Sequence, residues 1–260
     1  MLVQNINMAL RRSKKKEPSK EEFRLKERLK VEEGVFDLPT LRRLAKLFSA
    51  GIVSKLYFKL ATGKEADIFL AEPGDKVKDE LVVLKIFRVQ TTNFRNRLDY
   101  VLGDPRFGSV KQDMFSIVAT WCKKEFGNLE VAEDAKVNAP KPYDFVGNIL
   151  AMQFIGKDGM PAPILKDVKL EKPDVFLDKI LEQVKKLYKH GLVHADLSEY
   201  NILVMDNEPY LIDFGQAVVV EHPSASEFLK RDLSNIISYF SEKYGIKRNV
   251  EEAYAYIKDG

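Results

Sequence analysis

The sequence predicts an α+β fold in two parts, an antiparallel β-sheet followed by a mostly helical part. The chain has 260 residues, which is long enough for a two-lobed unit with a buried core. Short runs of β-forming residues lie between residues 52 and 87, and such runs bounded by turn residues are typical of strands. Beyond residue 110, apolar residues recur at helical spacing, which indicates amphipathic helices.

The elements expected in the first part are separated by turn residues. Gly63 follows the first β-run, and Pro73 with Gly74 follows the second, so we expect an antiparallel meander. The expected elements are, in order, a helix at 39–48, strands at 52–60, 66–71 and 81–87, a flexible loop at 88–108, a helix at 110–135, and strands at 143–147 and 149–155.

The second part is expected to begin with a helix at 173–190, because Pro173 stands near its start and Gly191 in the C-terminal capping position. A last helix is predicted at 224–243. Between them we expect a hairpin-like unit of short strands at 193–197, 201–205 and 210–214. The expected domains are a basic arm and helix at 1–50, a sheet lobe with the long helix at 51–155, and a helical lobe at 156–260.

Composition excludes several classes of protein. Apolar residues make up 45% of the chain and charged residues 31%, which is outside the range of disordered chains. Cys122 is the only cysteine, so the chain can form neither an internal disulfide nor a cysteine zinc cluster, and we expect a reducing, cytoplasmic location. Apolar runs such as 81–84 are far shorter than the roughly 20 residues that cross a membrane, so we expect no membrane partner.

Positive charge is concentrated at the start of the chain. The net charge is 42 − 39 = +3, but residues 1–50 contribute 13 − 7 = +6, which leaves −3 for the remainder. Most of these basic residues lie at 11–30. Such a segment is either a solvated helix or tail, or an arm that contacts RNA or another acidic surface. Composition does not distinguish the two.

Four polar motifs follow one another in a fixed order. They are Ala-Thr-Gly-Lys-Glu-Ala-Asp-Ile at 61–68, Lys85 in an apolar run, His-Ala-Asp-Leu-Ser-Glu-Tyr-Asn at 194–201, and Asp-Phe-Gly at 213–215. Phosphoryl transfer needs positioned charge around a polyanion: a loop over the phosphates, a lysine on them, metal ligands, and a group that aligns the acceptor. The order of the motifs therefore predicts a nucleotide phosphotransferase.

The first two motifs are weak signals by themselves. The loop at 61–68 contains one glycine, Gly63, and a strand–turn–strand loop with one glycine is common. Lys85 shares a strand face with Val83 and Phe87, and a lysine that points into a core needs an anion. The alternative is an edge-strand lysine that extends to solvent.

The motif at 194–201 is the strongest signal. It places a carboxylate that can align the acceptor, Asp196, and a metal-binding amide, Asn201, at the two ends of one short loop. An amide binds hard cations weakly without a carboxylate beside it, and Asp213 supplies that carboxylate from the end of a strand. We expect His194 to pack and hydrogen-bond locally.

Lys85 also needs a counter-charge, and the helix predicted at 110–135 offers Glu125 and Glu130. Glu125 falls on the apolar stripe by steps of three and four residues. Glu130 directly follows Leu129 of that stripe and so lies about 100° further round the helix. We therefore expect Glu125 to face inward and pair with Lys85, with an ordinary surface glutamate as the alternative.

Together the motifs resemble the RIO kinases, atypical serine/threonine protein kinases, and within them the Rio1 branch. The resemblance covers about residues 50–245. It rests on residues 61–68, on Val-His-Ala-Asp-Leu-Ser-Glu-Tyr-Asn-Ile-Leu-Val at 193–204, and on Ile-Asp-Phe-Gly-Gln-Ala-Val at 212–218. It implies a two-lobed protein-kinase-like fold with a truncated helical C-lobe and ATP between the lobes.

The resemblance also implies a role for each site residue. Asn201 and Asp213 would hold Mg²⁺ or Mn²⁺, and Asp196 would align or deprotonate the acceptor hydroxyl, with Lys85 and Glu125 as its catalytic partners. The residues that would bind ATP are Thr62, Gly63, Lys64 and Lys85 near the phosphates, Ile68 and Val83 above the adenine, Leu203 and Ile212 below it, Met152 at the back of the pocket, and the hinge from Gln153 to Ile155.

The chain departs from ordinary protein kinases, as RIO kinases do. Only 260 − 215 = 45 residues of this sequence follow Gly215, without an Ala-Pro-Glu sequence, so we expect no activation segment and substrate-binding helices of the ordinary kind. Ser198 replaces a lysine on the γ-phosphate, and losing one such contact costs roughly 3 kcal/mol, about a hundredfold in rate. We therefore expect slow turnover. Ala61 replaces the usual loop serine of the family. Ser109 resembles the autophosphorylated loop of the family, with an inert linker serine as the alternative.

The function implied is a serine/threonine kinase and ATPase that acts on protein hydroxyls, including its own, or on water. By the resemblance its partner is a small ribosomal subunit precursor or another protein substrate, and the basic arm allows RNA contact. A small-molecule kinase of the aminoglycoside or choline type is one alternative, although the short tail after Gly215 counts against it. A non-catalytic assembly factor that only binds nucleotide is the other.

Overall fold

A computed structural model describes residues 36–89, 106 and 113–259. Their contacts divide them into two compact units. The first comprises 36–88 with 143–153, and the second comprises 89, 106, 113–142 and 154–259. The basic arm at 1–33, most of the loop expected at 88–108, and Ser109 lie outside the described residues, so the predictions made for them stay predictions.

The first unit is a five-stranded sheet with strands in the order β1-β2-β3-β5-β4. Its strands are β1 (Val53–Thr62), β2 (Ala66–Pro73), β3 (Val82–Phe87), β4 (Pro142–Val146) and β5 (Ile149–Gln153). The pairs β1–β2, β2–β3 and β3–β5 are antiparallel, which confirms the predicted antiparallel sheet.

One face of this sheet forms the core of the first unit. Phe69 pairs with Leu84, and Leu84 with Ala151, so these three side chains share that face. They pack with Leu44 and Leu47 of helix α3 (Leu38–Ser49). The side chain of Asp37 caps this helix by accepting the N–H of Thr40 at 2.8 Å, a cap typically worth about 1 kcal/mol.

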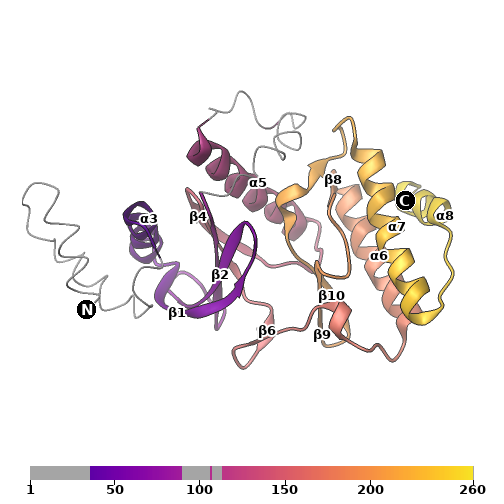
Figure 1. The fold of residues 1–260 in the computed structure, drawn as a ribbon, viewed down its shortest axis with the longest axis horizontal. Helices are drawn as coiled ribbons and strands as arrows, with labels where there is room; N and C mark the ends of the chain where they lie inside the picture. The colour runs from indigo at the N-terminus through magenta and orange to yellow at the C-terminus, as the bar shows by residue number, and fades with distance from the viewer. Residues whose placement is uncertain (1–35, 90–105, 107–112, 260) are drawn as a thin grey trace, which may run out of the picture. The chain divides into compact units, whose positions relative to one another are not determined.

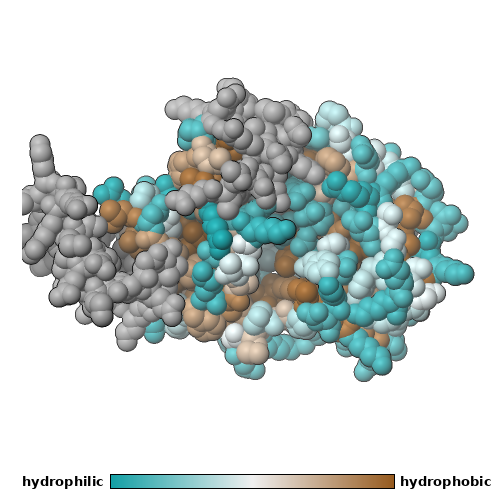
Figure 2. All heavy atoms as spheres, in the orientation of Figure 1, coloured by the Kyte–Doolittle hydropathy of each residue, from teal (hydrophilic) through white to brown (hydrophobic). Residues whose placement is uncertain are grey.

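The second unit contains the helices α5 (Met114–Asp134), α6 (Pro173–Lys189), α7 (Ala225–Tyr244) and α8 (Val250–Lys258). The first three confirm predicted helices, and α8 follows them as an additional short helix. The helices α6, α7 and α8 pack against one another in Figure 1. Their fully buried residues include Ile180, Leu187, Leu233, Phe240 and Ile257. The face of this unit seen in Figure 2 is mainly hydrophilic, and no helix in the described ranges has the length and apolar character needed to cross a membrane.

The short strands of the second unit pair differently from the prediction. β9 (Ile202–Met205) pairs with β10 (Glu208–Leu211) in a hairpin. Its two turn residues, Asp206 and Asn207, have φ of 54° and 60°, as a type I′ turn requires. β8 (Leu192–Val193) pairs instead with β11 (Val218–Val219). A further hairpin joins β6 (Gly156–Lys157) to β7 (Met160–Pro161).

Three predicted strands are shorter than expected, because their last residues take other conformations. The run at 193–197 ends as a strand at Val193, since Ala195 has φ of 61°. The run at 210–214 ends at Leu211, since Asp213 has φ of 64° and leads into the 3₁₀ helix η3 (Phe214–Gln216). The run at 149–155 ends at Gln153.

The sequence placed α5 in the sheet lobe, whereas the contact-based division groups it with the second unit. There its buried face contacts η3. The predicted boundaries at residues 50 and 155 stay a prediction.

Candidate active site

The sheet face opposite α3 carries predicted nucleotide-binding residues. Ile68 pairs with Lys85, and Val83 pairs with Met152. Because residues directly opposite each other point the same way and alternate residues share a face, these four side chains lie on one face. Lys85 is 9% exposed, and its Nζ lies 5.1 Å from the centre of the Phe87 ring. The first unit therefore presents an apolar surface that contains one buried lysine.

The predicted phosphate loop is a tight turn between β1 and β2. The N–H of Gly63 donates to the carbonyl of Ala66 at 2.9 Å, and a Cβ at Gly63 would lie 3.1 Å from that oxygen. Thr62 pairs with Asp67 across the β1–β2 ladder. Thr62, Gly63 and Lys64 are exposed, as a loop that covers phosphate would be.

The base of this loop is held by Asp67, which sequence reasoning did not single out. Arg88 donates to Asp67 at 2.8 and 3.3 Å, and Lys59 lies 3.4 Å away. Burial alone would raise the pKa of Asp67, but the hydrogen bond from Arg88, with Lys59 and Thr62, lowers it below its usual value. The backbone N–H of Arg88 also donates to Glu65 at 2.7 Å. Lys59 of β1 and Asp67 of β2 thus connect the two strands that flank the loop. Arg88 connects the end of β3 to the same place.

The predicted hinge begins at the end of β5. The side-chain amide of Gln153 donates to Asp79 at 3.2 Å, and the hydroxyl of Tyr143 donates to the other oxygen of Asp79 at 2.5 Å. Ile155 belongs to the second unit, is 5% exposed, and accepts the N–H of Ala162 at 3.0 Å.

The predicted catalytic loop, residues 194–201 of the second unit, is anchored by Asp232 of α7, a residue that sequence reasoning missed. Its two carboxylate oxygens accept the N–H groups of Ala195 at 2.7 Å and of Leu197 at 2.9 Å, on either side of Asp196. Burial raises the pKa of Asp232 to about 7, although the two N–H bonds oppose this shift. His194 bonds through Nε2 to the carbonyl of Ile212 at 3.0 Å, which agrees with its expected local role.

Asp196, Asn201 and Asp213 are brought together in the second unit. The amide nitrogen of Asn201 donates to the backbone oxygen of Asp196 at 2.8 Å and lies 3.4 Å from its carboxylate. The N–H of Ile212 donates to the carbonyl of Asn201 at 3.0 Å, which joins the residue before Asp213 to Asn201. Gln216, also missed from the sequence, donates to the Asp196 carboxylate at 3.0 Å.

This arrangement fits a hard divalent cation. Because the Asn201 nitrogen is bound to Asp196, its amide oxygen is the atom that could bind a metal, and the carboxylate of Asp213, an exposed residue, could supply a second oxygen. Within the described part of the chain, no group of three His, Cys, Asp or Glu residues is suited to hold a metal. The two oxygen ligands would therefore need phosphate oxygens and water to complete a Mg²⁺ site, as is common for this ion.

Leu203 and Ile212, predicted below the adenine, lie close in sequence to the predicted metal ligands Asn201 and Asp213. Leu203 pairs with Tyr210 across the β9–β10 hairpin, and Ile212 follows Tyr210 by two residues. Both side chains are partly exposed, so they are available to a ligand in this unit.

Glu125 is 1% exposed, whereas Glu130 is exposed, as the helical stripe predicted. A Cβ built on Gly215 would lie 2.6 Å from Nε1 of Trp121 and 3.3 Å from Oε2 of Glu125. The predicted pair of Glu125 with Lys85, and the convergence of Lys85 with Asp196 around one nucleotide, would join the two units and stay predictions.

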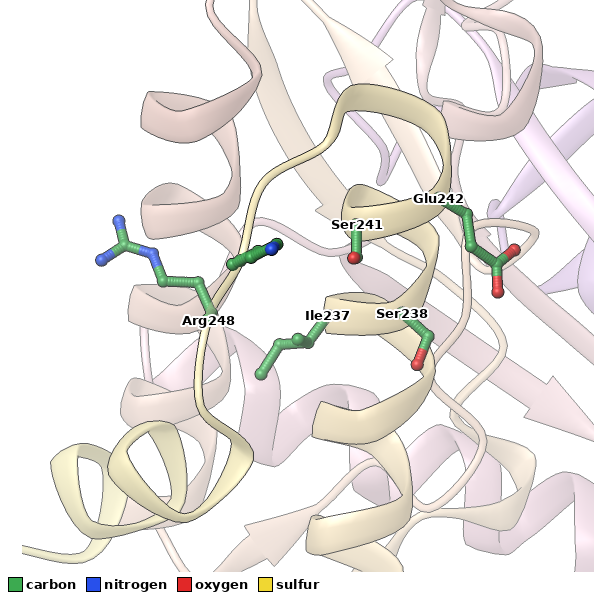
Figure 3. A pocket seen from close by; sticks show the side chains of 6 residues that line it. Ile237, Ser238, Ser241, Glu242 and Arg248 are labelled. Carbon is green, nitrogen blue, oxygen red and sulfur yellow. The ribbon is translucent and has the colours of Figure 1, made fainter.

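A cavity of about 350 Å³ lies on the second unit outside this site (Figure 3). It is lined by Ile237, Ser238, Ser241, Glu242, Lys247 and Arg248. Arg248 pairs with Asp178 at 2.9 Å, and the charges of Glu242 and Lys247 oppose each other. None of the predicted site residues lines it.

Comparison with known proteins decides the family. A family model described as the RIO domain matches residues 67–253. The chain belongs to the RIO kinase family. It is 38% identical over 249 residues to the RIO-type serine/threonine-protein kinase Rio1 of Haloferax volcanii, covering 94% of this chain and 84% of that protein. It is 39% identical to the Rio1 kinase of Methanocaldococcus jannaschii, covering 99% and 87%. These relatives place the RIO chain in the Rio1 branch.

Solved structures support the fold of this RIO chain. A Rio2 kinase of Chaetomium thermophilum matches with a TM-score of 0.66 at 22% identity, covering 88% of this chain and 73% of that one. The same kinase in a complex described as ADP/Mg²⁺-phosphoaspartate matches with a TM-score of 0.64 at 23% identity, covering 85% and 67%. These matches confirm the predicted two-part kinase-like fold.

Proposed function

We propose that this protein transfers the γ-phosphate of ATP to serine or threonine hydroxyls of proteins, including its own, or to water. The single observation that carries the proposal is the backbone and side-chain link between Asn201, Asp196 and the segment of Asp213. That link holds an acceptor-aligning carboxylate beside two oxygen ligands of the kind that bind Mg²⁺. Membership of the Rio1 branch supports the same reaction.

The residues divide the chemistry between them. Asp196 accepts a hydrogen bond from the acceptor hydroxyl and takes its proton as the phosphate is transferred. Gln216 and Asn201 fix the orientation of that carboxylate. Mg²⁺ or Mn²⁺, when bound, supplies positive charge for the phosphate oxygens, and Asn201 and Asp213 hold it.

The remaining roles follow from the first unit and from the comparisons. Ile68, Val83 and Met152 bind the adenine, and Lys64 and Lys85 bind phosphate. The Rio2 complex with ADP and Mg²⁺ supports ATP and Mg²⁺ as the ligands. Because Ser198 supplies no positive charge to the γ-phosphate, turnover is slow. We further propose a cytoplasmic role in maturation of the small ribosomal subunit, with RNA contact through the basic arm.

An assay with γ-labelled ATP and Mg²⁺ tests this function. Phosphoprotein and released phosphate are followed with and without small-subunit particles. We expect Asp196→Asn to lower both products at least a hundredfold, and Asp213→Asn to lower them with loss of the response to Mg²⁺. Glu171→Gln, an exposed residue outside the site, serves as the matched control.

The same assay separates the alternatives. Transfer of label to an aminoglycoside or choline would favour a small-molecule kinase. Nucleotide binding without any turnover by the wild type would favour a non-catalytic assembly factor, and either result would overturn the proposal. A lack of stimulation by small-subunit particles would overturn only the ribosomal role.

A further inference from the structure

Two polar residues of α5 are completely buried, although an amphipathic helix normally buries apolar residues there. Lys124 and Asn128 are both 0% exposed. They lie four residues apart, so they are neighbours on one face of the helix. Burying an ammonium group is costly unless hydrogen bonds compensate it, and a methionine of similar length would fill the same space without that cost. The position of Lys124 therefore needs a reason other than packing.

Both side chains bind the backbone directly after the metal ligand Asp213. Lys124 donates to the carbonyl oxygen of Gly215 at 3.1 Å and also to that of Ala217. Asn128 donates to the carbonyl of Phe214 at 2.8 Å and to that of Ala217 at 3.1 Å. Of the four carbonyls at 214–217, three thus accept hydrogen bonds from these two side chains of α5. We call Lys124 and Asn128 the α5 clasp.

The segment needs an outside partner because its own backbone bonds are few. Asp213 adopts the left-handed conformation at φ of 64°, which is unfavourable for a residue with a side chain. The following η3 turn has three residues, with one described internal bond from the N–H of Ala217 to Phe214 at 3.2 Å. The bonds from Lys124 to the carbonyls of Gly215 and Ala217 therefore hold a segment that its own backbone bonds hold weakly.

We propose that Lys124, supported by Asn128, is a positioning residue that sets where the Asp213 carboxylate meets the metal. This inference rests on the proposed function and adds a residue to it. Mg²⁺ demands near-ideal octahedral geometry at about 2.0–2.1 Å, so a small shift of the loop weakens metal binding. Of the residues that we propose to bind adenine, Ile68, Val83 and Met152 lie on β2, β3 and β5. Only Ile212 adjoins the segment that the clasp holds, so binding of ATP without metal should change little when the clasp is removed.

The test compares Lys124→Met with Lys123→Met. Lys123 is the preceding residue of α5 and is exposed, so the second variant makes the same chemical change without touching the loop. In the full-length protein we measure phosphate release against Mg²⁺ concentration, ATP binding in EDTA, and hydrogen exchange of the peptide covering 212–219. For Lys124→Met we expect about a tenfold higher Mg²⁺ concentration for half-maximal rate, faster exchange, and unchanged metal-free ATP binding. Lys123→Met should match the wild type.

The outcomes separate the clasp from the proposed function. The clasp would be overturned if a folded Lys124→Met variant reached half-maximal phosphate release at the same Mg²⁺ concentration as the wild type. It would also be overturned if ATP binding in EDTA weakened as much as the response to Mg²⁺. Wild-type protein without Mg²⁺-dependent phosphate release would overturn the proposed function instead. If Lys124→Met does not fold, Asn128→Leu is measured in its place. This variant removes the two hydrogen bonds that Asn128 donates without removing a charge. We expect a smaller rise in the Mg²⁺ concentration for half-maximal rate, and no rise would likewise overturn the clasp.

Discussion

The predicted phosphate loop of the first unit and the predicted metal-binding segment of the second, residues 213–217 (the metal loop), are held by different kinds of interaction. The base of the phosphate loop depends on Asp67 and Arg88, whose side chains are 18% and 38% exposed. Exposed ion pairs are worth about 0–1 kcal/mol and weaken with salt. The metal loop and the catalytic loop depend on Asp232, Lys124 and Asn128, which are at most 1% exposed.

The difference concerns how freely each loop moves. Leaving one buried donor or acceptor unsatisfied costs about 1–3 kcal/mol, so the metal loop and the catalytic loop are held at a defined position. The phosphate loop can shift at little cost to the fold. The loop that we propose to admit and release nucleotide is thus held weakly, and the loops that we propose to hold a metal and the catalytic carboxylate are held firmly.

The largest effect is expected at the buried anchor. Asp232→Ala leaves the N–H groups of Ala195 and Leu197 without their acceptor, so we expect a loss of about 3–5 kcal/mol in the free energy of unfolding. Phosphate release should fall at least a hundredfold. Denaturant unfolding and the phosphate assay measure both, with Ser234→Ala, an exposed residue of the same helix, as the control. A variant as stable as the wild type would show that the anchor is not needed.

The contributions of Asp232 and Asp67 to the free energy of unfolding change with pH in opposite directions. The folded pKa of Asp232, about 7, lies above its unfolded value of roughly 3.9. The folded state therefore binds more protons, and this group lowers stability as pH rises from about 4 to 7. Asp67, whose folded pKa is lowered, contributes stability that is lost as pH falls through that pKa. Unfolding measured from pH 4 to 8 should depend less on pH in Asp232→Asn, and an unchanged pH dependence would contradict the assignment.

A smaller effect is expected where α5 meets the metal loop. A Cβ added by Gly215→Ala would lie 2.6 Å from Nε1 of Trp121, and such overpacking costs about 1–3 kcal/mol. Gly127→Ala is the control, because nothing lies within 4 Å of a Cβ there, and a helix gains about 0.5–1 kcal/mol from this change. The free energy of unfolding should therefore fall in Gly215→Ala and rise in Gly127→Ala. If both variants were destabilised, the contact with Trp121 would not explain the effect at Gly215.

The smallest effect is expected at the phosphate loop. Arg88→Gln removes the ion pair with Asp67, and we expect a loss of at most about 1 kcal/mol in stability. The KM for ATP should rise a few-fold in low salt, and this difference from the wild type should shrink as salt screens the pair. Lys78→Gln, an exposed change on the same unit, is the control. A loss above about 2 kcal/mol, beyond the usual range of exposed pairs, would mean that this loop is held as firmly as the metal loop.

Periodicity predicted most of the fold because burial follows local patterns. The predicted helices and sheet strands are present, and alternation along one strand predicted that Val83 and Lys85 share a face. Ile68 and Met152 were named only through the family resemblance, and the register of the sheet places them on that same face. Spacing likewise suggested that Asn201 and Asp213 lie together. These features depend on residues close in sequence.

The exact ends of the short strands could not be predicted, because partners far along the chain determine them. Ala195 leaves the strand where Asp232, 37 residues later, accepts its N–H. Lys124 binds carbonyls 91 and 93 residues away, and backbone groups leave no side-chain signature. A usable signal existed in the polar residues on apolar helix faces: Asp232 beside Leu229 and Leu233, and Asn128 beside Leu129.

A second contact holds the chain just before the metal loop. The N–H of Leu211, two residues before Asp213, donates to the carbonyl of Asn138 at 2.8 Å, just after α5. Both groups belong to the main chain, so evolutionary drift in side chains can erase the contribution of Lys124 but cannot remove this one. Only a proline at 211, or an insertion or deletion that shifts the two segments, would break it. Side-chain substitution can therefore weaken one half of this attachment, while the other half persists as long as the two backbone segments keep their places.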